Sequence, residues 1–208
     1  MEIFDISAPL VEKGMVYPGD TPFHSEVVSS IKNGDECTLS KLTMSSHSGT
    51  HFDAPSHFIP DGLTVENVSL KPFYGPVRVT EYLNKDLITS EEIEPYLEKG
   101  VERLLCRTRG SQLIRGGDFK KDHPALTSSA ARLIADFGLK LVGIDYITIE
   151  RAGGDFPVHK ILLGNKIAIL EGLQLENIEP GDYILSAFPL KIHRGDGAPC
   201  RAVLIKPS

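Results

Sequence analysis

Residues 47–57 read His-Ser-Gly-Thr-His-Phe-Asp-Ala-Pro-Ser-His. This stretch gathers three imidazoles and a carboxylate within a few residues, in a chain with only seven histidines. His47, His51 and Asp53 offer two neutral nitrogens and a hard oxygen, a ligand mixture that suits zinc or manganese. His57 remains as a titratable group beside the metal. The stretch therefore predicts a metal site and favours a hydrolase.

The motif must lie on a loop or a strand, because its serines, glycine, threonine and proline would make a poor helix. In an extended segment residues two apart face the same way, so His51 and Asp53 can point together at one ion. Gly49 permits the turn that brings His47 to the same place. The helical zinc signature His-Glu-x-x-His does not fit, since Ser48 stands where its glutamate would be. The sequence also lacks a Gly-x-Ser-x-Gly elbow and a phosphate-binding loop.

Length and composition set the scale of the fold. A chain of 208 residues with 41% hydrophobic content can bury one sizeable core, and no repeat or linker divides it. We therefore expect one domain over residues 1–208. The net charge of −6 argues against nucleic acid or an anionic membrane as a partner. No signal-like start or long apolar run is present, so we expect a cytoplasmic protein without membrane spans.

The three cysteines are odd in number, far apart and outside any Cys-x-x-Cys motif. This spacing favours neither a disulfide framework nor a thiolate zinc site. We expect Cys37, Cys106 and Cys200 all to be buried as small apolar residues.

Strand-like segments outnumber helical ones, which predicts an α/β domain with mixed strands. Strands are expected at Glu2–Pro9, His24–Ile31, Cys37–Ser46, Gly75–Tyr82, Val101–Thr108, Leu139–Ile147, Lys166–Glu171, Asp182–Lys191 and Cys200–Lys206. Helices are expected after a capping box of Thr89 and Glu92, from Thr127 to a stop at Gly138, and over Asp155–Leu163 before a stop at Gly164-Asn165.

Two distant residues are candidates to complete the metal site. Glu171 ends the apolar run Ile167–Leu170, so its carboxylate needs a cation or strong donors to offset desolvation. His159 lies twelve positions earlier, where a polar stretch becomes apolar. Taken alone, Glu171 also fits a capped or paired glutamate, and His159 fits a half-buried structural histidine. The residues by themselves leave both roles open.

The spaced motif, followed by His159 and Glu171, resembles the metal-dependent cyclase family that contains the bacterial kynurenine formamidases and isatin hydrolases. The resemblance spans nearly the whole chain, and it includes Tyr17-Pro18-Gly19-Asp20-Thr21-Pro22, Gly143-Ile144-Asp145 and Asp196-Gly197-Ala198-Pro199-Cys200-Arg201. It implies a swivelling β/β/α fold with mixed sheets, and two divalent ions, zinc or alternatively manganese. The implied ligands are His47, His51, Asp53 and Glu171 for one ion, and Asp53, His159 and Glu171 for the other.

Such a pair of ions can share a hydroxide and polarise a carbonyl group. The resemblance implies that His57 is the general acid/base that supplies a proton to the leaving nitrogen. The alternative for His57 is a structural role that orients Asp53. The positive site would favour a substrate or product that carries a carboxylate, and the resemblance implies a small aromatic molecule.

The implied reaction is that of an arylformamidase of tryptophan catabolism, which converts N-formylkynurenine and water to kynurenine and formate. Tyr17 stands where the formamidases typically place a substrate-packing tryptophan, and Tyr146-Ile147-Thr148 replaces a smaller stretch. These departures keep open a hydrolase of a cyclic amide or lactone such as isatin. A third alternative is a binding protein that the metal only stabilises. The resemblance also suggests a homodimer, in which Tyr17 could serve its own or a neighbouring site.

Overall fold

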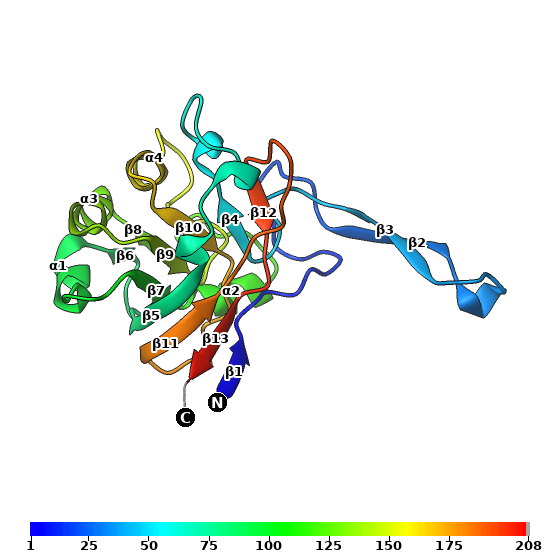
Figure 1. Ribbon diagram of the computed structural model, residues 1–208, viewed down its shortest axis with the longest axis horizontal. Helices are drawn as coiled ribbons and strands as arrows, with labels where there is room; N and C mark the ends of the chain where they lie inside the picture. Colours follow the sequence, from blue (N-terminus) through cyan, green and yellow to red (C-terminus); the bar gives the residue numbers. More distant parts are fainter. Residues whose placement is uncertain (207–208) are drawn as a thin grey trace.

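A nine-stranded mixed sheet forms the body of the protein, and the computed structural model describes residues 1–206 (Figure 1). The strand order is β1-β13-β11-β5-β7-β9-β10-β4-β12. The four central strands β5, β7, β9 and β10 run parallel, and every other pairing in this sheet is antiparallel. The expected α/β class with a mixed sheet is confirmed.

The strands of this sheet are β1 (Glu2–Asp5), β4 (His51–Asp53), β5 (Tyr74–Glu81), β7 (Arg103–Arg107), β9 (Leu141–Ile144), β10 (Ala168–Glu171), β11 (Gly181–Ser186), β12 (Gly197–Pro199) and β13 (Val203–Lys206). Two small ribbons pair β2 (His24–Ser29) with β3 (Leu39–Thr43), and β6 (Leu87–Ile88) with β8 (Ala125–Leu126). The α-helices are α1 (Ser90–Ile93), α2 (Gly110–Arg115), α3 (Ser128–Phe137) and α4 (Pro157–Gly164). Short 3-10 turns occupy Ile31–Asn33, Pro55–His57, Val65–Asn67, Lys71–Phe73 and Glu94–Tyr96. None of the described helices combines the length and apolarity needed to cross a membrane.

All nine expected strands are present, most of them shorter than their β-rich sequence suggested. The helix stops and caps also agree: Thr127 accepts a hydrogen bond from the Ala130 amide, and Gly138 takes φ of 84°. Helix α4 begins two residues later than expected, at Pro157, and ends at Gly164, with Asn165 as its C-cap. Strand β4 forms within the motif that was expected on a loop or a strand. The short strands β6, β8 and β12 and helix α2 were missed, because two to six residues carry too little periodic pattern.

The core lies on both faces of the central sheet, as the alternation of β7 shows. Leu104 and Cys106 pack toward the helices α3 and α4, while Leu105 joins a second cluster on the opposite face. That second cluster is closed by the sheet itself, since it contains Leu204 from β13 and Phe52 from β4. The sheet therefore curls around one apolar face, and the helices cover the other face.

The ribbon of β2 and β3 projects from the body as a long arm (Figure 1, blue to cyan). It carries large apolar side chains that are more than half exposed, namely Val27, Val28, Ile31, Leu39 and Leu42. Cys37 lies on this arm and is exposed, so the prediction that all three cysteines are buried is wrong. Cys106 is buried and Cys200 is partly buried. A ribbon of only two strands has no interior in which a thiol could be buried.

Just before strand β4 begins, the backbone at Gly49 and Thr50 passes close to the backbone at Gly172. Gly172 follows β10 with φ of 67°, and a Cβ atom there would lie 2.2 Å from the Gly49 carbonyl oxygen. Thr50 Oγ1 donates to the Gly172 carbonyl at 2.6 Å across the same crossing. Glycine at position 172 therefore permits both the left-handed conformation and the contact between the two segments.

We predict that Gly172→Ala lowers the free energy of unfolding by about 3 kcal/mol, because a methyl group adds a backbone clash to the strain of a positive φ. The matched control is Gly138→Ala, where φ is 84° but no atom lies within 4 Å of the added carbon. That control should cost only about 1 kcal/mol. Urea denaturation of both variants measures the difference, and equal losses would contradict the role of the crossing.

Candidate metal centre and catalytic site

Strand β4 places two of the expected ligands side by side. His51 and Asp53 are both buried and point to the same side of the strand, with His51 Nε2 3.5 Å from Asp53 Oδ1. Phe52 between them packs on the opposite side, into the core. The turn at Gly49, with φ of 64°, returns His47 to the same point, and its Nδ1 lies 2.8 Å from Asp53 Oδ1. The structure thus gathers the three residues as the alternation of an extended strand predicts.

The sheet register brings the distant carboxylate to this cluster. Glu171 is the direct neighbour of His51 in the antiparallel pair of β10 and β4, and Glu171 Oε2 lies 3.3 Å from His51 Nε2. His159 comes from helix α4, with Nε2 3.2 Å from Glu171 Oε1 and 3.6 Å from Asp53 Oδ2. Asp53 and Glu171 therefore stand between the imidazoles, in the position that bridging ligands would take.

Two of the imidazoles are oriented from behind. His51 Nδ1 lies 2.9 Å from the Gly49 carbonyl oxygen, and His159 Nδ1 lies 2.9 Å from Glu150 Oε2. Glu150 is itself buried and accepts hydrogen bonds from the backbone amide of Val158 at 3.0 and 3.1 Å. An acceptor at Nδ1 leaves Nε2 free to bind a cation, which is how metal-ligating histidines are usually held.

The third imidazole has a partner from the C-terminal part of the chain. His47 Nε2 lies 3.1 Å from Asp196 Oδ2, while Ser46 Oγ donates to Asp196 Oδ1 at 3.0 Å. The Asp196 backbone carbonyl also accepts from the Ala54 amide at 2.9 Å. The Asp196 carboxylate is therefore fixed over the outer edge of the site.

The carboxylates of the cluster stabilise positive charge on two of the histidines, as the pKa values of His47 and His159 show. Burial disfavours the charged imidazole of His47, but hydrogen bonds to Asp196 and Asp53 outweigh it and raise its pKa to about 10. Burial likewise opposes the charge on His159, yet hydrogen bonds to Glu150 and Glu171 raise its pKa to about 10. The carboxylates thus draw protons onto both rings when no other cation is present. Divalent ions would satisfy the same demand and leave the rings neutral as ligands, so this donor set fits zinc or manganese.

His57 lies at the mouth of the cluster rather than within it. Its side chain is 30% exposed, its ring centre is 4.0 Å from that of His47, and its Nδ1 is 3.6 Å from Asp196 Oδ2. Burial is the main cause that lowers its pKa, so the ring is mostly neutral at pH 7. It is placed to exchange a proton with a molecule above the cluster.

A cavity of about 400 Å³ opens directly above these groups. Its walls include Tyr17, Phe58, Phe156 and Thr148. Its floor contains all five expected ligands, four of them from β4, α4 and β10 and the fifth, His47, from the loop before β4. The Phe58 ring lies 5.2 Å from that of Phe156, which makes an aromatic wall. Phe156 adopts φ of 50°, a strained conformation for a large residue. Tyr17 reaches the cavity of its own chain.

The sequence reasoning did not assign a role to Glu150 or to Asp196. Glu150 has only one signal in the sequence, an acidic residue ahead of the helix that carries His159. Asp196 lies in the terminal segment that carried part of the family resemblance, yet only the fold brings it to His47 and His57. Both residues act on histidines that are far away in the chain or on another element, so spacing could not reveal them.

The fold and the site together define an α/β protein with a buried histidine and carboxylate centre suited to divalent ions. A model of the Cyclase family matches residues 4–151. The chain is 37% identical to a kynurenine formamidase of Bacillus anthracis over 96% of this chain and 95% of that relative. It is also 37% identical to a kynurenine formamidase of Bacillus cereus, over 98% of this chain and 97% of the relative. The chain belongs to the cyclase family.

Solved structures show the same architecture. A structure described as a potential metal-dependent hydrolase with cyclase activity is 30% identical, with a TM-score of 0.83 and 99% of each chain covered. An isatin hydrolase bound to the product analogue thioisatinate is 25% identical, with a TM-score of 0.87. The match covers all of this chain and 93% of the isatin hydrolase chain. The family fold expected from the resemblance is therefore confirmed.

We predict that Glu150→Gln weakens zinc binding by roughly 10- to 100-fold. The glutamine side chain is uncharged, so it would hold the His159 ring less firmly than the Glu150 carboxylate does. Competition with a chromophoric chelator measures the affinity. Glu92→Gln is the matched control, since Glu92 also accepts from a backbone amide at the start of a helix, at 2.9 Å from Thr89 N, but belongs to α1. Unchanged zinc affinity in Glu150→Gln would contradict the orienting role.

Proposed function

We propose that this protein is a metal-dependent arylformamidase that converts N-formylkynurenine and water to kynurenine and formate. The observation that carries this proposal is the buried group of three histidines and two carboxylates on the floor of an aromatic-walled cavity. The relatives of about equal length that share 37% identity are kynurenine formamidases, which supports the same substrate. The reaction is hydrolysis of a C–N bond that is not a peptide bond.

The proposed ligands are divided between two divalent ions, with zinc preferred. His47, His51 and Asp53 form one compact group of donor atoms, and Asp53, His159 and Glu171 form another. Asp53 belongs to both groups, and Glu171 lies within 3.3 Å of His51 as well, which supports both as bridging carboxylates. When bound, such ions supply the Lewis acidity that makes water a nucleophile at neutral pH and polarises a carbonyl group.

His57 is proposed as the residue that moves protons. It faces the cavity, is mostly neutral at pH 7, and can take a proton from water and return it to the leaving nitrogen of the amide. No hydrogen bond joins His57 to Asp53 among the described residues; its nearest carboxylate in an ion-pair contact is Asp196. This arrangement favours the catalytic role over orientation of Asp53.

The cavity walls support an aromatic substrate. Tyr17, Phe58 and Phe156 offer ring faces, and Ile147 adds an apolar surface between them. Tyr17 is itself held by an edge contact with Phe119, at 5.3 Å between ring centres. A ring of the substrate can therefore lie between fixed walls while its formamide group faces the histidines.

Isatin, a cyclic amide, is the second candidate substrate. A tyrosine at position 17 covers less ring area than a tryptophan, and the isatin hydrolase fold matches with a TM-score of 0.87. Hydrolysis of either substrate needs the same cluster and the same proton carrier. The choice between them is therefore a question of kcat/KM.

We predict that the purified protein contains divalent metal, hydrolyses N-formylkynurenine with a higher kcat/KM than isatin, and loses this activity on chelation. His57→Ala should lower kcat by roughly 100- to 10,000-fold with unchanged metal content, because only the proton carrier is removed. Absorbance assays with both substrates and elemental analysis measure these quantities.

His24→Ala is the control for the histidine substitution, because its side chain is 61% exposed on the arm. Full activity in His57→Ala would overturn its catalytic role. A higher kcat/KM for isatin would assign the second substrate. A metal-bound, folded protein inactive on both would favour a metal-stabilised binding protein.

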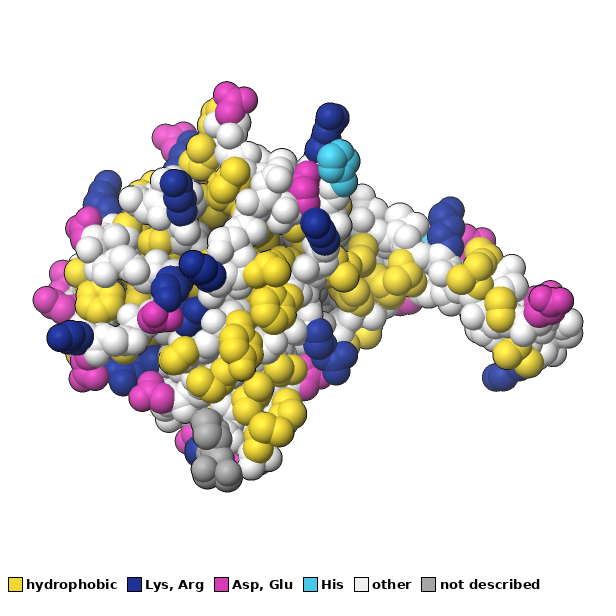
Figure 2. All heavy atoms as spheres, viewed as in Figure 1, with side chains coloured by type: hydrophobic (Ala, Val, Ile, Leu, Met, Phe, Trp, Pro, Cys, Tyr) yellow, Lys and Arg dark blue, Asp and Glu magenta, His cyan; other side chains and the backbone are white. Residues whose placement is uncertain are grey.

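We further propose that the protein is a homodimer in which the β2–β3 arm of each subunit packs against the other subunit. An isolated two-stranded ribbon is marginally stable in water, and this one exposes Val27 and Leu42 on one face. Figure 2 shows apolar side chains gathered on the body as well as on the arm. Among the exposed apolar residues of the body, Tyr74 and Phe188 stack with ring centres 6.4 Å apart and are about half exposed. A second copy would cover both surfaces at once in a two-fold arrangement.

We predict that the double variant Val27→Asp/Leu42→Asp weakens dimerisation by more than about 100-fold, because two buried aliphatic contacts of about 2 kcal/mol each are lost. Sedimentation equilibrium gives the dissociation constants. Glu26→Ala/Lys41→Ala, a cross-strand pair on the other face of the ribbon, should leave the dimer intact. A monomeric wild-type protein would refute the proposal.

The cytoplasm is the proposed location. Cys37, Cys106 and Cys200 are all free thiols, which suits a reducing compartment.

A further inference from the structure

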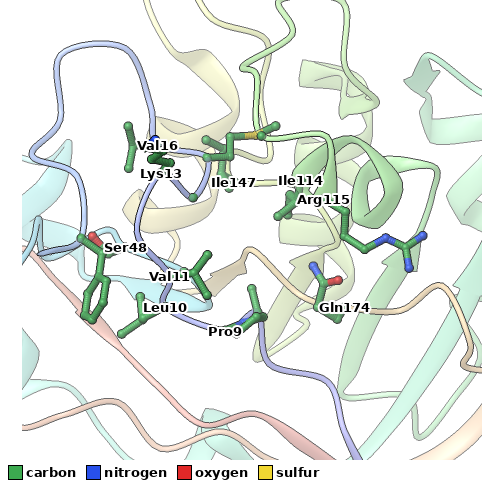
Figure 3. A pocket seen from close by; sticks show the side chains of 16 residues that line it. Pro9, Leu10, Val11, Lys13, Val16, Ser48, Ile114, Arg115, Ile147 and Gln174 are labelled. Atoms are coloured by element: carbon green, nitrogen blue, oxygen red, sulfur yellow. The ribbon is translucent and has the colours of Figure 1, made fainter. Parts of the chain in front are cut away.

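A second cavity lies behind the metal-binding loop (Figure 3). It measures about 260 Å³ and is bounded by the N-terminal segment 8–16, the end of α2 and the loop residues Ser48 and Gly49. Its apolar lining includes Leu10, Val11 and Ile114. Ile147 is the single residue that lines both this cavity and the catalytic one. We call the cavity behind this loop the rear cavity.

The charged residues that line the rear cavity are all basic. Lys13 and Arg115 line it, and none of its sixteen lining residues is an aspartate or a glutamate. Arg115 holds Glu176 at 2.5 Å, but its side chain stays 59% exposed and keeps donors for a further partner. A molecule in this cavity would therefore meet apolar walls and the Lys13 side chain, with the Arg115–Glu176 ion pair at the edge.

One buried polar atom in the wall has no partner. The Ser48 hydroxyl is buried and makes no hydrogen bond with any described residue, although buried hydroxyl groups are nearly always paired. Ser48 stands on the wall of the rear cavity (Figure 3). The oxygen itself is closed off from solvent, so other atoms of Ser48 form this part of the wall, and the packing of the loop rather than a ligand accounts for the unpaired hydroxyl.

We propose that the rear cavity binds a small apolar carboxylate, at a site separate from the catalytic cavity. An apolar cavity of about 150 Å³ is enough for a benzene-sized molecule, so this one has room for about six carbons and a head group. The walls match the hydrocarbon part, and Lys13 and Arg115 match the negative charge. The lining itself contains no acidic group, and Glu176 offsets Arg115, so Lys13 carries most of the preference for an anion over a neutral or cationic ligand.

The position of the rear cavity connects it to the catalytic site. Ser48 and Gly49 lie between His47 and His51 in the chain, and the Leu10 side chain lies 2.8 Å from where a Cβ of Gly49 would be. The N-terminal segment that lines the rear cavity continues into the Tyr17 wall of the catalytic cavity. A ligand in the rear cavity therefore contacts the back of the loop whose front bears the proposed ligands.

Hexanoate and its uncharged analogue hexan-1-ol are suitable probes, measured by isothermal titration calorimetry. Hexanoate should saturate one site in the protein as purified and equally after chelation, which separates the rear cavity from a metal ion. Ile114→Trp fills the cavity and should weaken hexanoate by about tenfold or more. Val11→Trp, at the partly exposed mouth, tests the same point if Ile114→Trp does not fold.

The charge is tested with Arg115→Gln and Lys13→Asn, which should each weaken hexanoate by about threefold and leave hexan-1-ol unchanged. Arg132→Gln, an exposed cation on α3, is the matched control and should change neither. These measurements involve no turnover, so their outcome is independent of the proposed formamidase activity.

The proposal would be overturned by no saturable binding, by binding that disappears on chelation, or by wild-type affinity in the cavity-filling variants. Binding only in the arm variant Val27→Asp/Leu42→Asp would overturn it as well, because a second copy of the chain would then be the natural occupant.

Discussion

The fold depends on the need of two buried carboxylates for positive charge. Asp53 and Glu171 are each no more than 2% exposed, and an uncompensated charge in such a place costs several kcal/mol. His47, His51 and His159 surround them and can either take up protons or bind a shared cation. Because the balance is so costly to break, the register of β10 on β4 and the position of α4 must be kept. The site is therefore part of what holds the centre of the molecule together.

The same constraint explains the unusual backbone around the site. The Gly172 crossing lets the segment after β10 contact the loop at Gly49, between His47 and His51. Gly197 leaves room for the His47 ring, since a Cβ atom at position 197 would lie 2.5 Å from that ring. Phe156 is strained at φ of 50° just before the helix that carries His159. Strain and close packing are concentrated where several elements must deliver side chains to one point.

The N-terminal part of the chain serves the site from outside the central sheet. Segment 8–16 lines the rear cavity, Tyr17 lines the catalytic cavity, and the arm of β2 and β3 follows directly. Segment 8–16 and Tyr17 contribute to a small apolar cluster that contains Met15, Tyr146 and Ile147. A molecule or a partner chain that engages this region therefore contacts the walls of the catalytic cavity without touching the proposed metal ligands.

The sequence by itself determined the α/β class, the nine principal strands and the local part of the site. His47, His51, Asp53 and His57 could be found because alternation and one glycine turn act over a few residues. Glu171 and His159 could only be named as candidates, since their meeting with β4 depends on sheet register and helix packing. The tertiary structure alone decided the contacts of Glu150 and Asp196, the exposed arm with Cys37, and the rear cavity. These features join residues far apart in the chain or depend on which surfaces remain uncovered, and neither property leaves a periodic pattern in a sequence.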